Sequence, residues 1–358
     1  MKPNVMLYCL TADTAYFIQY DEGDNLFDTR KYPIIFLSQT MIAKRFIRLP
    51  RDDFLNFTQY INVDQVNVVW MFHSVRCGST AYSQVFNALP GWITMSEPQS
   101  LGSIFDTQGD QALFFVKSAE FKTVAEAIVK CNLKNIPENN KGVFIKSSVF
   151  DEHLPPMIGK VFPHHKLLFA YRDVQPGAES FYKVVNPVVV DAMLSLSIDP
   201  FTEDRHGARQ RLMASLGYLT DNVKNLLQKV RPQSLIEWYT LQWSIRNHLF
   251  HQAIRGNKAI RFYSLRYEDL QRNRTDTIVR LFKHLNIDQE NLDAALASLE
   301  IDSQEGTFLS KRARARNPNW NRTEDSVARC NEILRAFKLP DFDSDFNFDA
   351  WIKMMNEL

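Results

Sequence analysis

The feature that most constrains the fold is an alternation of short apolar runs with helix-periodic segments, which begins at Val66. The apolar runs are Val66–His73, Gly142–Lys146, Lys166–Tyr171 and Ala259–Leu265. Apolar residues at three- and four-residue spacing predict helices over Thr80–Leu89, Val174–Val185, Arg209–Val230, Leu235–Arg255 and Thr275–Leu285. Because strands that alternate with helices pair in parallel, we expect an α/β fold, a three-layer sandwich with a central parallel sheet and helices on both faces.

The N-terminal segment has a different character. It is rich in aromatic and β-branched residues, as in Ile34–Leu37. This composition favours strands, so we expect a small β-rich elaboration over residues 1–62 and one larger domain over residues 63–358. The sequence assigns no role to the elaboration.

The balance of charge limits the partners of the chain. Lysine and arginine number 42, aspartate and glutamate number 41, and the formal net charge is +1. Such a chain has no overall attraction for polyanions or anionic membranes, so we expect no nucleic-acid partner. Any cationic site must be local.

The cysteines and the N-terminus bear on the compartment. The cysteines are Cys9, Cys77, Cys131 and Cys330. They lie far apart without CxxC spacing, which favours a reducing compartment over a zinc site or a disulfide framework. The apolar run Val5–Leu10 is short and Asp13 follows it, so we expect no leader or membrane span. We therefore predict a cytoplasmic protein, with the Golgi lumen as the alternative if the sequence is a trimmed form.

A candidate phosphate-binding loop follows the first apolar run. Residues His73–Thr80 connect this run to an amphipathic helix, a context in which backbone amides can cradle a phosphate. A nucleotide-hydrolysing GxxxxGK[ST] loop would carry lysine where Ser79 stands and glycine where His73 stands, so ATP or GTP hydrolysis is disfavoured. Arg76 and the hydroxyls of Ser79 and Thr80 offer donors for a phosphate. The alternative is a solvated turn with a capping hydroxyl.

Cys77 lies within this loop and invites a second interpretation. A cysteine-phosphatase loop places its arginine after the nucleophile, whereas Arg76 precedes Cys77. Cys77 is therefore expected to be a small loop residue.

Three motifs in order resemble those of the PAPS-dependent sulfotransferases, where PAPS is 3′-phosphoadenylyl sulfate. Arg76–Thr80 resembles the 5′-phosphosulfate loop, usually written Pro-Arg-Ser-Gly-[Ser/Thr]-Thr. Tyr171–Asp173 with Ser180 resembles the 3′-phosphate motif, and Arg266–Leu270 is similar to a Tyr-Glu-Asp-Leu segment. The layout is most similar to that of the carbohydrate and protein-tyrosine sulfotransferases. The chain departs from the family at Val174, where proline is frequent, and before Arg76, where glycine and proline are common.

The resemblance implies a P-loop-type sandwich that transfers a sulfuryl group from PAPS to a hydroxyl and releases 3′-phosphoadenosine 5′-phosphate (PAP). It implies no metal ion. The residues implied to bind the nucleotide are Arg76, Cys77, Gly78, Ser79, Thr80, Ala81, Arg172, Ser180, Tyr267, Arg312 and Arg314.

The second motif has a physical rationale of its own. Selective binding of a 3′-phosphate dianion calls for a bidentate cation and a hydroxyl donor on a rigid element. Arg172 closes a predicted strand, and Ser180 lies about two turns into the next predicted helix. The alternative is a local ion pair between Arg172 and Asp173, with Ser180 as an ordinary helix residue.

The late basic run Lys311–Arg316 places four cations in six residues, with Trp320 close behind. In sulfotransferases a late basic loop covers the nucleotide, and this run resembles it in position. The alternatives are a solvated tract or a nonspecific nucleic-acid patch.

Sulfuryl transfer needs a base for the acceptor hydroxyl and positive charge at the bridging oxygen of the leaving nucleotide. Glu97 follows a short predicted strand, Trp92–Ser96, and its distance from Arg76 resembles that of the base in protein-tyrosine and carbohydrate sulfotransferases. Lys146 ends another strand and should face the same edge of the sheet. We therefore predict Glu97, Arg76 and Lys146 as the catalytic residues. The alternatives are a capping or salt-bridging carboxylate for Glu97 and a surface strand-end lysine for Lys146. Cytosolic sulfotransferases use a histidine instead, for which His73 is the alternative.

Three functions stay open from the sequence. The first is a sulfotransferase that acts on a hydroxyl of a carbohydrate, a phenol or a tyrosine. The second is a small-molecule kinase on the same fold, and the third is a non-catalytic PAP-binding protein. We expect the acceptor to contact Leu101–Phe115 and Val188–Arg209, which carry no readable motif. The oligomeric state is open.

Overall fold

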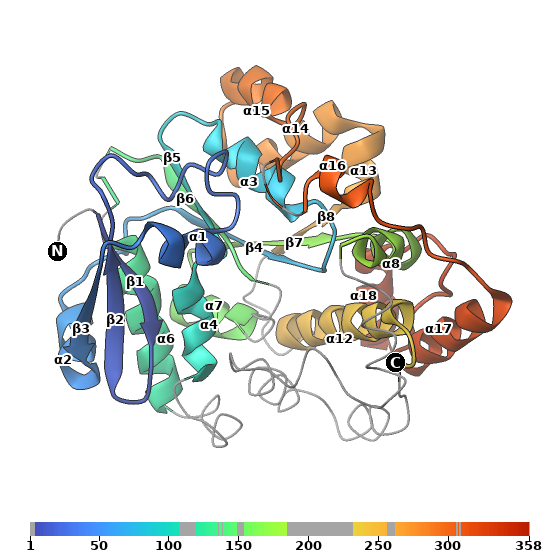
Figure 1. The fold of residues 1–358 in the computed structure, drawn as a ribbon, viewed down its shortest axis with the longest axis horizontal. Coiled ribbons are helices and arrows are strands. Elements are labelled where there is room, and N and C mark those ends of the chain that lie inside the picture. Colours follow the sequence, from blue (N-terminus) through green and yellow to red (C-terminus); the bar gives the residue numbers. More distant parts are fainter. Residues whose placement is uncertain are drawn as a thin grey trace.

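The computed structural model describes residues 4–106, 119–134, 136–137, 139–148, 154–184, 232–255, 262–305, 307 and 309–357. Its centre is a five-stranded parallel sheet with the strand order β5-β6-β4-β7-β8 (Figure 1). The strands are β4 (Val68–His73), β5 (Trp92–Ser96), β6 (Gly142–Lys146), β7 (Lys166–Tyr171) and β8 (Phe262–Arg266). The predicted parallel sheet is confirmed.

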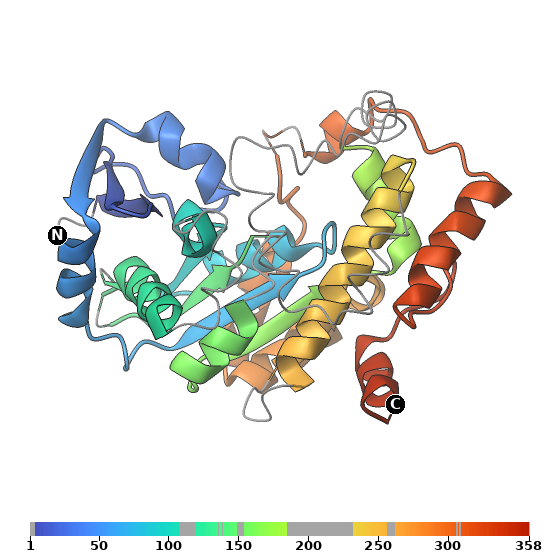
Figure 2. The ribbon, with the colours of Figure 1, turned by 90° about the horizontal axis from the view of Figure 1, so that it is seen from below.

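Side chains of the sheet alternate between two apolar layers. On β4, Val69 and Met71 pack into one cluster with Phe86 and Phe282, whereas Trp70 belongs to the other. Because residues on both faces of the central strands are buried, the sequences of these strands are continuous apolar runs and not alternating patterns. Helices cover both faces of the sheet, and Figure 2 shows the face on which α7 and α12 lie. The three-layer sandwich is therefore present.

The helices of this larger part are α3 (Ser79–Asn87), α4 (Gln99–Asp106), α6 (Ala119–Leu133), α7 (Leu154–Val161), α8 (Val174–Tyr182), α12 (Leu235–Arg255), α13 (Tyr267–Arg272), α14 (Arg274–Leu285), α15 (Leu292–Ser298), α16 (Lys311–Arg314), α17 (Glu324–Ala336) and α18 (Phe348–Glu357), with a 3-10 turn at Gln289–Asn291. No helix among the described residues is long and apolar enough to cross a membrane.

The N-terminal segment forms a small antiparallel sheet, as the composition predicted. Its strands β1 (Val5–Leu10), β2 (Thr14–Gln19) and β3 (Arg45–Pro50) pair in that order. Two helices accompany them, α1 (Ile35–Ile42) and α2 (Arg51–Gln59). The apolar cluster of this sheet is continuous with that of the main sheet. The division at residues 62 and 63 stays a prediction.

The sequence placed most described elements within a few residues. Gly142–Lys146, Lys166–Tyr171 and Leu235–Arg255 have the predicted bounds. The last strand is Phe262–Arg266, later than the predicted Ala259–Leu265, whose first three residues lie outside the described part of the chain. The predicted helix Arg209–Val230 also lies outside it. All four cysteines are free thiols, and the cytoplasmic location stays a prediction.

Candidate active site

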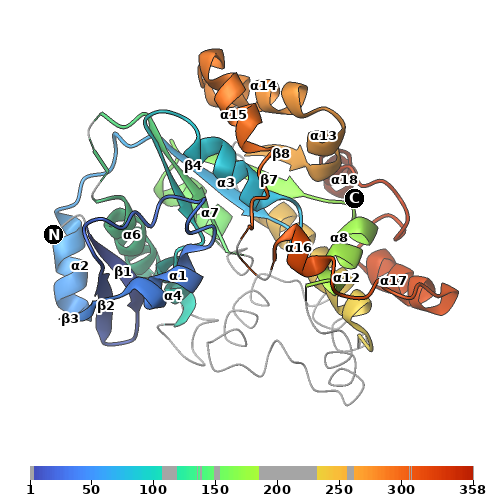
Figure 3. The ribbon, with the colours of Figure 1, turned by 45° about the horizontal axis from the view of Figure 1, so that its top comes forward.

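A cavity of about 390 Å³ opens at the carboxyl edge of the parallel sheet. This is the edge at which ligands bind in α/β folds. The sequence-predicted residues that line it are Arg76, Cys77, Gly78, Ser79, Thr80, Ala81, Glu97, Lys146, Arg172, Ser180, Tyr267 and Arg314. Arg312 is exposed and is not among the lining residues. In Figure 3, α1, α3, α8 and α16 lie around this edge.

The loop between β4 and α3 is shaped by Gly78. Its φ is +79°, in the left-handed region that favours glycine, and it caps the N-terminus of α3. A Cβ added at Gly78 would lie 2.6 Å from Cδ2 of Tyr267, so the ring of Tyr267 lies directly against the loop backbone. Ser79 and Thr80 begin the helix and are buried. The loop thus presents backbone amides and two hydroxyls to the cavity, as a phosphate requires.

Arg76 has a left-handed backbone although it is not glycine, with φ +62°. Such a conformation costs free energy and persists only where neighbouring groups hold it. Arg172 Nη1 donates to the Arg76 carbonyl at 3.2 Å, and the Tyr239 hydroxyl donates to the Val75 carbonyl at 2.8 Å. Arg172 and α12 therefore hold the loop in place.

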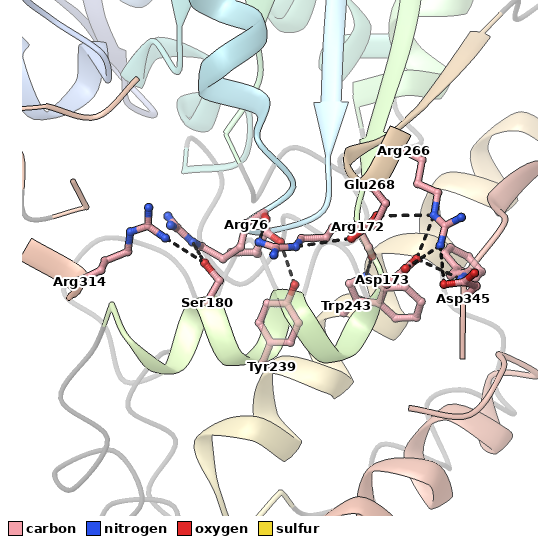
Figure 4. A network of polar contacts seen from close by, with 12 residues as sticks. Arg76, Arg172, Asp173, Ser180, Tyr239, Trp243, Arg266, Glu268, Arg314 and Asp345 are labelled. Carbon is pink, nitrogen blue, oxygen red and sulfur yellow. Dashed lines mark hydrogen bonds and ion pairs between the residues drawn. The ribbon is translucent and has the colours of Figure 1, made fainter. Parts of the chain in front are cut away.

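Three arginines converge beside Ser180. Arg76 Nε and Arg314 Nη1 donate to the Ser180 hydroxyl at 3.2 and 3.4 Å, and Arg172 lies next to them (Figure 4). Burial, followed by the charge of Arg314 and then that of Arg172, lowers the pKa of Arg76 to about 10. These cations repel one another in a partly desolvated place. An anion between them would relieve the repulsion.

The local ion pair that was the alternative for Arg172 does not form. Asp173 instead pairs with Arg266, whose nitrogens lie 2.6 and 3.2 Å from its two carboxylate oxygens (Figure 4). Arg172 lies over the ring of Tyr267, 4.4 Å from the centroid, with a Glu268 oxygen 3.7 Å from its Nε. Among the described residues this buried Nε makes no hydrogen bond. This Nε has Glu268 as its ion-pair partner, and Arg172 is among the residues that line the cavity.

Glu97 and Lys146 form a buried ion pair at the far side of the loop. The Lys146 side chain is only 2% exposed, and its Nζ also donates to Thr80 Oγ1 at 3.2 Å. Burying two charges is tolerated when they pair with good geometry and further hydrogen bonds. The carboxylate of Glu97, the ammonium of Lys146 and the hydroxyl of Thr80 thus form one chain of contacts that ends at the β4–α3 loop.

His73 and His165 are poorly suited to serve as the base. Both ring nitrogens of His73 face carbonyl oxygens, those of Ser74 and Ser147, at 3.1 and 3.0 Å. Burial and the charge of Lys146 lower the pKa of His73 to about 4, outweighing the opposing effects of Glu97 and the two carbonyls. His165 accepts from the Trp70 indole at 3.1 Å, at the opposite edge of the sheet.

Cys77 is buried in the loop, and burial raises the pKa of its thiol to about 11. A thiol with a raised pKa is a poor nucleophile. This agrees with the expectation that Cys77 is a small loop residue. Among the described residues, no group of three or more His, Cys, Asp and Glu side chains is placed to hold a metal ion.

Sequence reasoning missed two parts of the lining. Gln304 Nε2 donates to Thr80 Oγ1 at 3.0 Å from a segment without periodic pattern, so nothing marked it in the sequence. Ile34, Phe36 and Leu37 reach the cavity from the N-terminal segment. The apolar run was visible, but its place beside Glu97 depends on the tertiary structure. Val188–Arg209, and Leu101–Phe115 from residue 107 onward, lie outside the described residues.

Neither a family model nor a curated protein matches this sequence. Among solved structures, the chain is similar to a mouse sulfotransferase complexed with PAP, at 12% identity and a TM-score of 0.42, with 86% of this chain and 97% of that chain covered. It is also similar to the sulfotransferase domain of the Synechococcus PCC 7002 olefin synthase, at 13% identity and a TM-score of 0.38, with 83% and 97% covered. A third is a sulfotransferase from Alicyclobacillus acidocaldarius, at 12% identity and a TM-score of 0.35, with 81% and 99% covered. All three of these structures are sulfotransferases.

Proposed function

We propose that this chain transfers a sulfuryl group from PAPS to an acceptor hydroxyl. The observation that carries the proposal is one cavity with two chemically different ends. At one end Arg76 and Arg314 donate to Ser180 with Arg172 next to Arg76, and at the other a buried carboxylate and ammonium meet the phosphate loop. The first end suits a terminal phosphate, and the second suits proton removal beside a developing negative charge.

The residues fit a nucleotide with two separate anionic groups. Arg172, Arg314 and Ser180 would hold the 3′-phosphate, because all three line one cavity and provide guanidinium donors and a hydroxyl. The amides at the start of α3 and the hydroxyls of Ser79 and Thr80 would hold the 5′-phosphosulfate. Arg76 lies between the two groups and adds charge to both.

Glu97 would act as the general base. PAPS, when bound, supplies the sulfuryl group, and the sulfur–oxygen bond to the nucleotide breaks as the bond to the acceptor oxygen forms. Glu97 would take the proton of the acceptor hydroxyl during this attack. Lys146, which contacts both Glu97 and Thr80, would stabilise the charge that develops on the leaving oxygen.

The wall beside Glu97 favours an acceptor with an apolar surface. Ile34, Phe36 and Leu37 line this part of the cavity, and none of their side chains can form a hydrogen bond. A carbohydrate would leave hydroxyls unpaired against them, which costs free energy. A phenol or a tyrosine side chain fits this wall better.

The kinase alternative has less support, because Ser79 stands where a γ-phosphate site would carry lysine. A non-catalytic PAP-binding protein would share the anion site, so an activity assay must separate it from the enzyme.

The test uses radiolabelled PAPS with 2-naphthol, a tyrosine-containing peptide and methyl β-galactoside as acceptors, and compares the wild type with Glu97→Gln. We expect transfer to at least one acceptor and a fall of about 100-fold or more in the variant. PAP affinity should stay nearly constant, because Glu97 faces the acceptor. PAP binding without transfer to any acceptor would favour the non-catalytic alternative. Full activity of the variant would remove Glu97 from the role of base.

A further inference from the structure

The N-terminal unit, defined as residues 4–62, contacts the turn that carries Glu97. Gln39 on α1 is completely buried. Its Oε1 accepts a hydrogen bond from the Gln99 amide at 3.2 Å, and its Nε2 donates to the Leu7 carbonyl on β1 at 3.4 Å. One buried amide side chain therefore connects the small sheet to the first residue of α4.

Two further hydrogen bonds join the same two segments. The Ser96 hydroxyl donates to the Pro33 carbonyl at 2.6 Å, and the Phe36 amide donates to the Glu97 carbonyl at 3.2 Å. The turn Ser96–Gln99 thus forms three hydrogen bonds with residues 33–39. The side chains of Ser96 and Gln39 are both buried. Water therefore cannot readily take the place of a lost partner, and the loss of either bond costs free energy.

The backbone of Glu97 needs this support. Its φ is +56°, in the left-handed region, and Pro98 follows it, which favours extended backbone at this position. A strained residue persists only where its surroundings determine its conformation. The Glu97 amide donates to the Lys146 carbonyl at 2.9 Å, so the main sheet holds one side of the residue. The N-terminal unit holds the other side through the Glu97 carbonyl.

We propose that the N-terminal unit is a positioning device for Glu97, with Gln39 as its central positioning residue. This inference rests on the proposed function, in which Glu97 is the base. It assigns a role to a segment whose sequence indicated none. The unit would set the direction in which the carboxylate meets the acceptor and would leave nucleotide binding to the main sheet.

The expected effect of loosening the turn is a loss in turnover. A misplacement of about 1 Å at a reacting group can cost about 100-fold in rate. We expect Gln39→Met, which keeps much of the buried volume but removes both hydrogen bonds, to lower kcat by about 10- to 100-fold. The KM for PAPS and the affinity for PAP should change little, because no hydrogen bond or ion pair in the described structure joins Arg76, Arg172, Arg314 or Ser180 to the unit.

A double-mutant cycle distinguishes positioning from general destabilisation. If Gln39 acts through Glu97, Gln39→Met should cause no further loss in a Glu97→Gln background. Ser96→Ala removes a different hydrogen bond of the same turn, the one to the Pro33 carbonyl, and should behave in the same way. This second variant keeps the proposal testable if Gln39→Met does not fold. Gln59→Ala is the matched control, since Gln59 lies in the same unit but is exposed. It should have wild-type turnover.

Hydrogen exchange of the Gln99 amide provides a readout that does not depend on activity. The exchange should be faster in Gln39→Met than in the wild type, because the acceptor of this amide is lost. Unchanged exchange, or equal losses in turnover with and without Glu97, would overturn the positioning role. Faster exchange in a protein that transfers no sulfuryl group would support the contact and contradict the proposed function instead.

Discussion

Arg312 and Arg314 lie in the same basic run but in different surroundings. Arg312 is exposed, whereas Arg314 lines the cavity, donates to the Leu309 carbonyl at 3.0 Å and reaches Ser180. A charged hydrogen bond in a partly buried site contributes more to the free energy of ligand binding than an exposed charge does, because salt screens the exposed charge.

We therefore expect Arg314→Ala to weaken PAP binding by about 10- to 100-fold. Arg312→Ala is the matched control and should weaken it by about threefold or less. Titration calorimetry at one ionic strength measures both. Equal losses for the two variants would contradict the assignment of Arg314 to the phosphate.

His73 gives the fold a sensitivity to acid. Its pKa is about 4 in the folded chain, below the usual 6.5, because burial disfavours the charged ring. Between these two values the unfolded chain binds a proton that the folded chain does not. The free energy of unfolding therefore decreases as the pH falls from 6.5 towards 4.

Over this pH range we expect the free energy of unfolding to decrease less in His73→Gln than in the wild type. The difference should reach up to about 3 kcal/mol. The other described histidines with lowered pKa values are His165, His248, His251 and His284, and they are present in both proteins, so their effects cancel in the comparison. Urea unfolding at pH 4.5 and 7 measures the difference. Parallel pH profiles for the two proteins would show that His73 is not responsible.

At the scale of elements, one helix supports both segments that we propose to bind phosphate. From α12, the Tyr239 hydroxyl donates to the Val75 carbonyl, and the Trp243 indole donates to the Arg172 carbonyl at 2.9 Å. Gly177 on α8 permits this approach, because a Cβ there would lie 2.2 Å from the Tyr239 hydroxyl. The loop after β4 and the end of β7 are therefore held by the same rigid element.

The β4–α3 loop should tolerate no side chain at Gly78. Gly78→Ala combines a left-handed backbone with a collision against Tyr267. We expect it to lower the free energy of unfolding by about 1–3 kcal/mol and to weaken PAP binding. Gly23→Ala is the control, since no atom lies within 4 Å of its added Cβ, and its effect should stay within about 0.5 kcal/mol. Similar stability of the two variants would contradict the described loop.

At the scale of the whole molecule, a nearly neutral chain brings three arginines together in one cavity. The net charge is +1, yet Arg76, Arg172 and Arg314 meet in the same site. A ligand that neutralises them only in the folded state must stabilise that state.

PAP at 100 times its Kd should therefore add about 2.7 kcal/mol to the stability of the fold and raise Tm. The same concentration of 5′-AMP, which lacks the 3′-phosphate, should raise Tm much less. Arg172→Ala should largely remove the difference between the two nucleotides. Thermal scans measure all four combinations, and equal shifts for PAP and 5′-AMP in the wild type would count against the 3′-phosphate site.

The sequence by itself determined the elements and the order of the motifs. The strands β6 and β7 and the helix α12 have their predicted bounds, and the loop around Gly78 lies between a strand and a helix as expected. These features depend on local properties, namely the period of the apolar residues and the backbone freedom of glycine. Parallel pairing then brings Arg76, Glu97 and Lys146 to one edge of the sheet, which strand ends alone could predict.

Only the tertiary structure decided which of these residues have which partners. Asp173 pairs with Arg266 and leaves its neighbour Arg172 to the cavity, and Arg314 faces Ser180 while Arg312 faces away. Gln39 meets Gln99 across 60 residues of chain. Such pairings have no periodic or local signal, because they depend on how separately formed elements pack. The direction of a long polar side chain is set by the nearest partner in space, and the sequence does not show which partner that is.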